Sequence, residues 1–185
     1  MRELTSSRLA VAGAVLGGTA FAAAGALQAT GLHWKENAVQ TPLQHLTMVL
    51  IAIAFVAVVP TWAALGRLAS GWGRHGWVAI AVGQIVVAGA STVSNIRGVD
   101  ASWFPATAIA ANLVWVIGTI ALAIALYRGR RVPRLVAVGV VVAYLGSIPF
   151  GSQGGGIVTG CFWLAVGYLL SLGALERSAL QPATA

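Results

Sequence analysis

Charged residues divide the sequence into long uncharged, apolar runs, and these runs decide what the chain can fold into. The runs extend over residues 9–32, 46–66, 76–96, 101–127 and 135–175. A helix needs about 20 consecutive apolar residues to cross the hydrocarbon core of a bilayer. Each of the first four runs therefore predicts one transmembrane helix, and the last run is long enough for two.

The last run is interrupted by the segment "SIPFGSQGGG" at residues 147–156, where proline and glycine disfavour a helix and favour a turn. The sequence therefore predicts a single all-α transmembrane domain, residues 1–185, with six helices. We expect them at about residues 9–30, 44–66, 76–96, 104–127, 133–150 and 156–175. A signal peptide is the alternative for the first helix. Its apolar run is longer than a usual signal core, which favours a retained helix without deciding the question.

Composition agrees with a chain whose main partner is the lipid bilayer. Hydrophobic residues make up 58% of the sequence and charged residues only 8%, far from the balance of a soluble domain. The formal net charge is +7, but the basic residues are interleaved with apolar runs and do not form one patch. They are therefore interpreted as topology signals, and nucleic-acid binding is not predicted.

The positions of the basic residues predict the orientation of the chain. Only Lys35 and Arg97 fall on one side of the six expected helices, and all other basic residues fall on the opposite side: Arg2, Arg8, Arg67, Arg74, Arg128, Arg130, Arg131, Arg134 and Arg177. The positive-inside rule then places both termini in the cytoplasm, with three helical hairpins in a bacterial plasma membrane. The loops around residues 31–45, 94–105 and 147–155 form the outer face.

Polar residues inside the expected helices lie in stripes, because their spacing puts them on one helix face. One stripe contains Gln84, Ser91 and Asn95, and another contains Asn112, Trp115 and Thr119. Tyr144 extends the set. Hydrogen bonds between helices are one explanation, and a cavity that opens outward is the other. Glycine pairs with GxxxG spacing, Gly13 with Gly17 and Gly156 with Gly160, favour close helix packing.

The outer loops carry most of the acid and base chemistry. A carboxylic acid near the headgroup boundary, shielded by aromatic side chains, would keep its proton and could donate it. We expect Glu36 and Asp100 as acids and His45 as a base in an isomerase or cyclase for an isoprenoid- or lipid-like substrate. The candidate substrate-binding residues are His33, Trp34, Asn95, Arg97, Trp103, Asn112, Trp115 and Tyr144. The histidine spacing is not that of a metal site, so neither a metal nor another cofactor is predicted.

Two other functions remain open at this point. A small-solute transporter or channel would use Gln84, Ser91, Asn95, Asn112 and Thr119 as its path, with a homo-oligomer as one way to build it. No carboxylate lies within an expected helix, which counts against a proton-coupled carrier. An accessory membrane subunit would tolerate the loss of single outer polar residues. The sequence names neither the substrate nor the oligomeric state.

Three segments carry a resemblance to known proteins: "PLQHLTMVLIAIAFVAVVPTWAALGRLA", "RGRRVPRLVAVGVVVAYLG" and "GCFWLAVGYLLSLGALER". With these segments the chain resembles a group of small six-helix actinobacterial membrane proteins, which has no settled activity to transfer. In architecture alone it is also similar to compact membrane terpene cyclases, which use paired acidic residues in a helical bundle. The diagnostic motif of those cyclases does not align here, and none of the four acidic residues lies deep in an expected helix.

Overall fold

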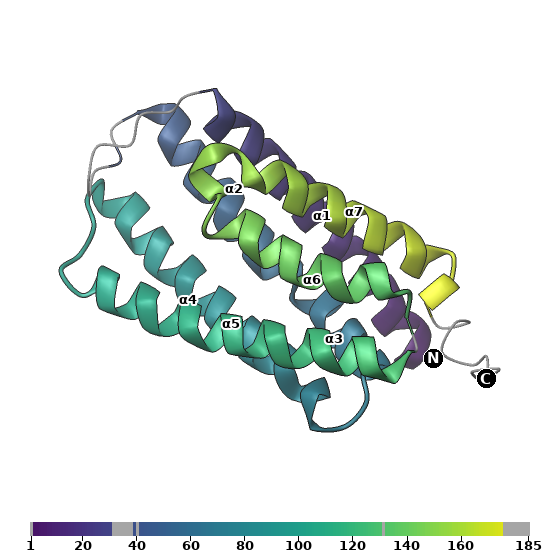
Figure 1. Ribbon diagram of the computed structural model, residues 1–185. Coiled ribbons are helices and arrows are strands. Elements are labelled where there is room, and N and C mark those ends of the chain that lie inside the picture. The colour runs from purple at the N-terminus through teal and green to yellow at the C-terminus, as the bar shows by residue number, and fades with distance from the viewer. Residues whose placement is uncertain (1, 31–38, 40, 131, 176–185) are drawn as a thin grey trace.

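The computed structural model describes residues 2–30, 39, 41–130 and 132–175, and within them the fold is all-α (Figure 1). The α-helices are α1 (Arg2–Ala29), α2 (Pro42–Ala57), α3 (Val59–Leu68), α4 (Gly76–Arg97), α5 (Phe104–Gly129), α6 (Arg134–Ser147) and α7 (Gly155–Ser171). Two short 3-10 helices, η1 (Trp72–His75) and η2 (Gly151–Gln153), precede α4 and α7. The prediction of an all-α fold is confirmed, and the described residues contain no strand.

Four helical segments are long and apolar enough to cross a membrane: Ser7–Ala29, Pro42–Leu68, Trp72–Arg97 and Phe104–Gly129. The second comprises α2 and α3, which are separated at Val58. Pro60 lies in the first turn of α3, where its missing N–H and its ring prevent one regular helix from continuing through this point. Helices α6 and α7 are also apolar but shorter. These helices are those expected of a helical membrane protein.

The helices form a closed ring. Contacts join α1 to α2, α2 to α4, α4 to α5, α5 to α6, α6 to α7, and α7 back to α1. Figure 1 shows the helices running side by side along the molecule, with the beginning of α1 and the end of α7 at the same end. We call this end the arginine end, because Arg67 and Arg128 lie in the last turns of α3 and α5 there, and Arg74 lies in η1. The opposite end, where α2 and α5 begin, is the loop end.

Glycines close the seam between α1 and α7. A side chain at Gly160 would place its first carbon 2.5 Å from the carbonyl oxygen of Gly18. Gly156 makes a similar backbone approach, to Phe21 and Gly25 of α1. Both glycines of this GxxxG pair therefore lie in a helix interface, where only a hydrogen atom fits between the backbones.

Candidate functional site

A line of aromatic rings crosses the interior of the ring of helices. Phe21 of α1 contacts Phe55 of α2 with ring centroids 5.4 Å apart, and Phe55 contacts Trp115 of α5 at 5.1 Å. Trp115 in turn contacts Tyr144 of α6 at 5.4 Å. All three contacts are edge-to-face, the arrangement that the charge distribution of aromatic rings favours. The line joins helices from opposite sides of the ring and fills its centre.

A second aromatic group lies on α3 and α7. The rings of Trp62 and Trp163 are 4.4 Å apart, and Phe162 contacts Trp163 at 5.0 Å. The indole N–H of Trp62 donates a hydrogen bond of 3.0 Å to Oε1 of Gln84, which is buried in α4. Gln84 therefore joins α3 to α4. Of the two explanations for its polar stripe, a hydrogen bond between helices and a cavity, this contact agrees with the first.

Buried polar atoms without a hydrogen-bond partner occur along one face of α5. Within the described residues, they are Oδ1 of Asn112, Nε1 of Trp115 and Oγ1 of Thr119, together with Oγ of Ser94 on α4. The spacing of three and four residues places the three α5 atoms on the same helix face. A buried polar group left unpaired costs about 1–3 kcal/mol, so such a row needs an explanation.

A cleft opens beside this row, between α5 and α6 toward the loop end. Its volume is about 290 Å³, and Asn112 and Tyr144 are its two polar lining residues. The rest of the lining is apolar: Ala108, Ile109, Leu113, Val116 and Ile148. Nδ2 of Asn112 donates to the carbonyl oxygen of Ala108 at 2.8 Å, which fixes the amide and leaves Oδ1 unpaired. We call this cavity the loop-end cleft.

His45 and Asn95 form a polar pair where α2 begins and α4 ends. Nδ1 of His45 lies 2.7 Å from Oδ1 of Asn95, and both side chains are half-buried. With the amide oxygen facing the ring, Nδ1 carries the proton and donates it, which leaves Nε2 as the free acceptor. Asn95 thus selects the tautomer in which Nε2 of His45 can accept a proton.

The start of α2 holds His45 in place. Thr41 and Gln44 form a capping box, in which the Gln44 backbone N–H donates to Oγ1 of Thr41 at 3.2 Å. The Thr41 N–H donates in return to Oε1 of Gln44 at 3.0 Å. These two bonds satisfy donors that a helix start otherwise leaves unpaired. The N–H of Val39 also bonds the carbonyl oxygen of Gly98 at 3.0 Å, which joins the two segments that carry the pair.

The remaining predicted site residues are distributed around the loop end. Arg97 is exposed in the last turn of α4, and Trp103 is exposed at the start of α5. Asp100 is half-buried in the turn between these helices and is not hydrogen-bonded to the His45–Asn95 pair. His33, Trp34 and Glu36 lie outside the described residues. In the described part of the chain, no group of three or more metal-ligating side chains could hold a metal ion.

The structure therefore brings the predicted residues together in two groups. Asn112 and Tyr144 line the loop-end cleft, and Trp115 contacts the Tyr144 ring from the interior. His45 meets Asn95 where α2 begins and α4 ends. Sequence reasoning missed Phe55, which supports Trp115 from the other side. An aromatic residue in the middle of an apolar run, far from either interface, was the available signal.

Comparisons of the chain with protein-family models, with curated proteins and with solved structures found no match. The fold and the site therefore have to define the class of protein. It is an all-α protein with apolar helices of membrane-spanning length around an aromatic interior, and a small cleft with buried polar atoms lies on one seam.

Proposed function

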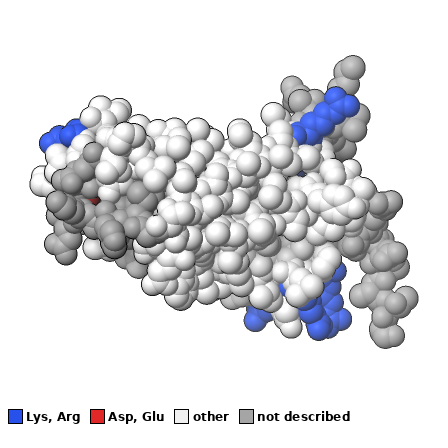
Figure 2. All heavy atoms as spheres, turned by 90° about the horizontal axis from the view of Figure 1, so that it is seen from above, with Lys and Arg blue, Asp and Glu red and all other residues white. Residues whose placement is uncertain are grey.

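We propose that the chain crosses a bacterial plasma membrane six times, as three hairpins, with the arginine end in the cytoplasm. On the face that Figure 2 shows, the basic side chains of the described residues lie toward the two ends of the molecule. Helix α6, with 14 residues, is the shortest span. It covers roughly 21 Å at about 1.5 Å per residue. The non-helical residues on both sides of it complete the crossing.

We further propose that the loop-end cleft binds a hydrophobic, isoprenoid- or lipid-like molecule that carries one polar group. The observation that carries this proposal is the unpaired, buried Oδ1 of Asn112 at a cleft whose other lining residues, apart from Tyr144, are apolar. A hydroxyl of the bound molecule would donate to this oxygen, while its hydrocarbon part lies against the apolar wall. Because the cleft lies between two neighbouring helices of the ring, the molecule would enter sideways from the bilayer.

The bound molecule would undergo an isomerisation or cyclisation by proton transfer. An acid adds a proton to one carbon of a double bond, and Nε2 of His45 removes a proton from a neighbouring carbon. Because His45 does not line the cleft, these carbons would belong to a part of the molecule that extends from the cleft toward the start of α2. The reaction needs no further reactant, because one proton is gained and one is lost. Asp100 and Glu36 are the proposed acids. Aromatic rings such as Trp115 and Tyr144 would stabilise the cation formed between the two steps.

Transport through the centre of the ring is the weaker alternative. Trp62, Trp115 and Trp163 occupy the interior, and each is only 1% exposed. Gln84, part of the expected path, is hydrogen-bonded by Trp62. A transport path would require these packed side chains to move apart.

Two asparagines provide matched variants for the test. Tritiated farnesol, an isoprenoid alcohol, is bound to the protein in lipid nanodiscs, and product formed in heavy water is analysed for carbon-bound deuterium. Asn112→Leu removes the acceptor in the cleft, and we expect up to about tenfold weaker farnesol binding from the loss of one hydrogen bond. Asn95→Leu leaves the cleft intact, so farnesol binding should stay unchanged.

The deuterium measurement separates binding from chemistry. His45→Ala should lower deuterium incorporation about 10²–10⁴-fold, the usual contribution of a positioned base, without weakening binding. Asn95→Leu should lower incorporation less, because the histidine is then present but not oriented. Unchanged farnesol binding in Asn112→Leu would refute the proposal that the loop-end cleft is the binding site. If the unmodified protein binds farnesol but incorporates no deuterium, the proposed proton-transfer reaction is refuted.

A further inference from the structure

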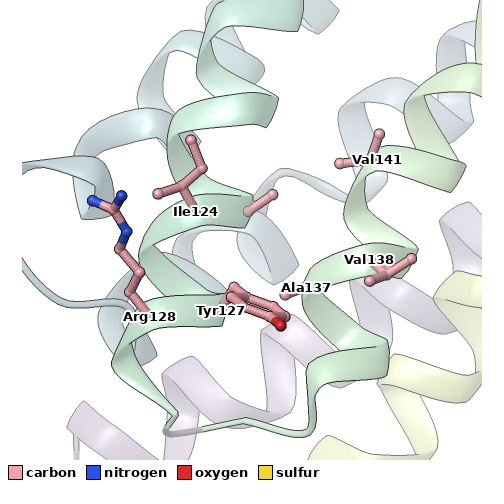
Figure 3. A pocket seen from close by; sticks show the side chains of 7 residues that line it. Ile124, Tyr127, Arg128, Ala137, Val138 and Val141 are labelled. Atoms are coloured by element: carbon pink, nitrogen blue, oxygen red, sulfur yellow. The ribbon is translucent and has the colours of Figure 1, made fainter.

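A second hollow lies on the same α5–α6 seam, toward the arginine end. This groove has a volume of about 420 Å³, and its aliphatic wall consists of Ala123, Ile124, Ala137, Val138 and Val141 (Figure 3). The exposed position of Ile124 and Val138 places the groove on the outer surface of the ring. We call it the arginine-end groove. Its wall matches the chemistry of a lipid acyl chain.

Aromatic and cationic side chains lie at one end of this groove. Figure 3 shows the Tyr127 ring between α5 and α6, beside Ala137 and Val138. The guanidinium carbon of Arg134 lies 5.4 Å from the centre of the Tyr127 ring. An aromatic ring attracts a guanidinium through its electron-rich face, so Tyr127 holds Arg134 at the end of the groove. Arg128 is also among the lining residues of the groove, but its guanidinium points away from α6 in Figure 3.

The charge at this end of the groove has no counterpart nearby in the sequence. Arg128, Arg130 and Arg134 are all exposed, and residues 101–175 contain no acidic residue. The compensating negative charge has to come from outside α5, α6 and α7. Basic sites between membrane helices are known to bind anionic lipid headgroups, and guanidinium groups pair well with phosphate.

We propose that the arginine-end groove binds one anionic phospholipid of the adjacent leaflet. One acyl chain lies along the wall formed by α5 and α6, and the phosphate pairs with Arg134 beside the Tyr127 ring. The exposed side chain of Arg128 turns from the flank of α5 toward the same phosphate. This site is separate from the loop-end cleft and does not depend on the proposed reaction. It would fix the position of the α5–α6 seam relative to the membrane surface.

Native mass spectrometry of the protein released from nanodiscs tests this proposal. The nanodiscs contain equal amounts of phosphatidylglycerol and phosphatidylcholine. We expect one phosphatidylglycerol molecule to remain bound. The double variant Arg128→Gln/Arg134→Gln should reduce its retention about 25-fold, at about fivefold for each arginine near the surface. Val138→Trp should also reduce retention, because it fills the groove and leaves every charge in place.

Arg74→Gln is the matched control for charge. Arg74 is exposed at the same end of the molecule but does not line the groove, so this variant should retain the lipid. Equal loss in Arg74→Gln and in the double variant would show a general surface attraction and overturn the proposal. Full retention in Val138→Trp, equal retention of phosphatidylcholine, or equal binding of free glycerol phosphate would also overturn it.

Discussion

The α1–α7 seam and the α5–α6 seam both close the ring, yet they are built in opposite ways. At the first seam, Gly160 and Gly18 bring the backbones so close that a single added carbon would collide with a carbonyl oxygen. At the second, cavities of about 420 and 290 Å³ are lined by Tyr127 and Tyr144, respectively. The α1–α7 interface is closely packed, and the α5–α6 interface contains cavities.

This difference shows where function can be placed in a small ring of apolar helices. Lipid is as apolar as the helix surfaces, so helices associate through close packing and hydrogen bonds. A glycine seam maximises packing and leaves no space. Cavities lie along part of the α5–α6 seam, and one of them is lined by Asn112, whose Oδ1 is unpaired. The close packing and the cavities therefore lie on different sides of the ring.

We expect the greatest loss of stability from a substitution in the glycine-lined interface between α1 and α7. Gly160→Leu should prevent the ring from closing, because its first side-chain carbon would lie 2.5 Å from the Gly18 carbonyl oxygen. Overpacking typically costs about 1–3 kcal/mol, and a rigid backbone neighbour makes the upper end or more the expectation. Yield of monodisperse protein in detergent and the midpoint of thermal unfolding measure the effect.

Gly89→Leu is the control for this prediction. Gly89 is also a helical glycine, but a side chain there would meet nothing within 4 Å. This variant should keep the yield and the unfolding midpoint of the unmodified protein. If Gly160→Leu is as stable as the unmodified protein, the backbones of α1 and α7 do not pack as closely as described.

We expect a smaller difference in stability between variants of two buried threonines, one hydrogen-bonded and one without a partner. Oγ1 of Thr159, between α6 and α7, donates to the carbonyl oxygen of Ala143 at 3.0 Å, whereas Oγ1 of Thr119 on α5 has no partner. Thr159→Val should lower the free energy of unfolding by about 0.5–1.5 kcal/mol. Thr119→Val removes an unpaired polar atom and should leave that free energy unchanged or raise it.

Unfolding of both threonine variants in a denaturing detergent series gives the comparison. The order of stability is the informative result, because the two substitutions are chemically identical. Greater destabilisation by Thr119→Val would mean that its hydroxyl is satisfied, and the row of unpaired atoms on α5 would lose one member.

Much of the fold could be predicted from the sequence, because charged residues punctuate the apolar runs. The runs gave an all-α chain with membrane-length helices, and the GxxxG pair at Gly156 and Gly160 pointed to a tight interface. The order of the ring could not be predicted. A helix that is apolar all round has no hydrophobic face, so its sequence does not indicate which side meets another helix.

The candidate site was predictable only in part. The spacing of Asn112, Trp115 and Thr119 indicated a common face, but whether their polar atoms are paired depends on neighbours from other helices. Gln84 shows the difficulty, since Trp62 satisfies it from a distant part of the sequence. The roles assigned to Glu36 and His33 remain predictions, because both lie outside the described residues.

We propose that a ligand dissolved in the bilayer occupies the loop-end cleft, and photo-crosslinking in the membrane tests this directly. Membranes containing the protein are irradiated with a diazirine derivative of farnesol, and labelled peptides are mapped by mass spectrometry. The account predicts that labels concentrate on residues 108–116 and 144–148 and are lost in Asn112→Leu. Labels spread evenly over the lipid-facing helices, or unaffected by that substitution, would contradict it.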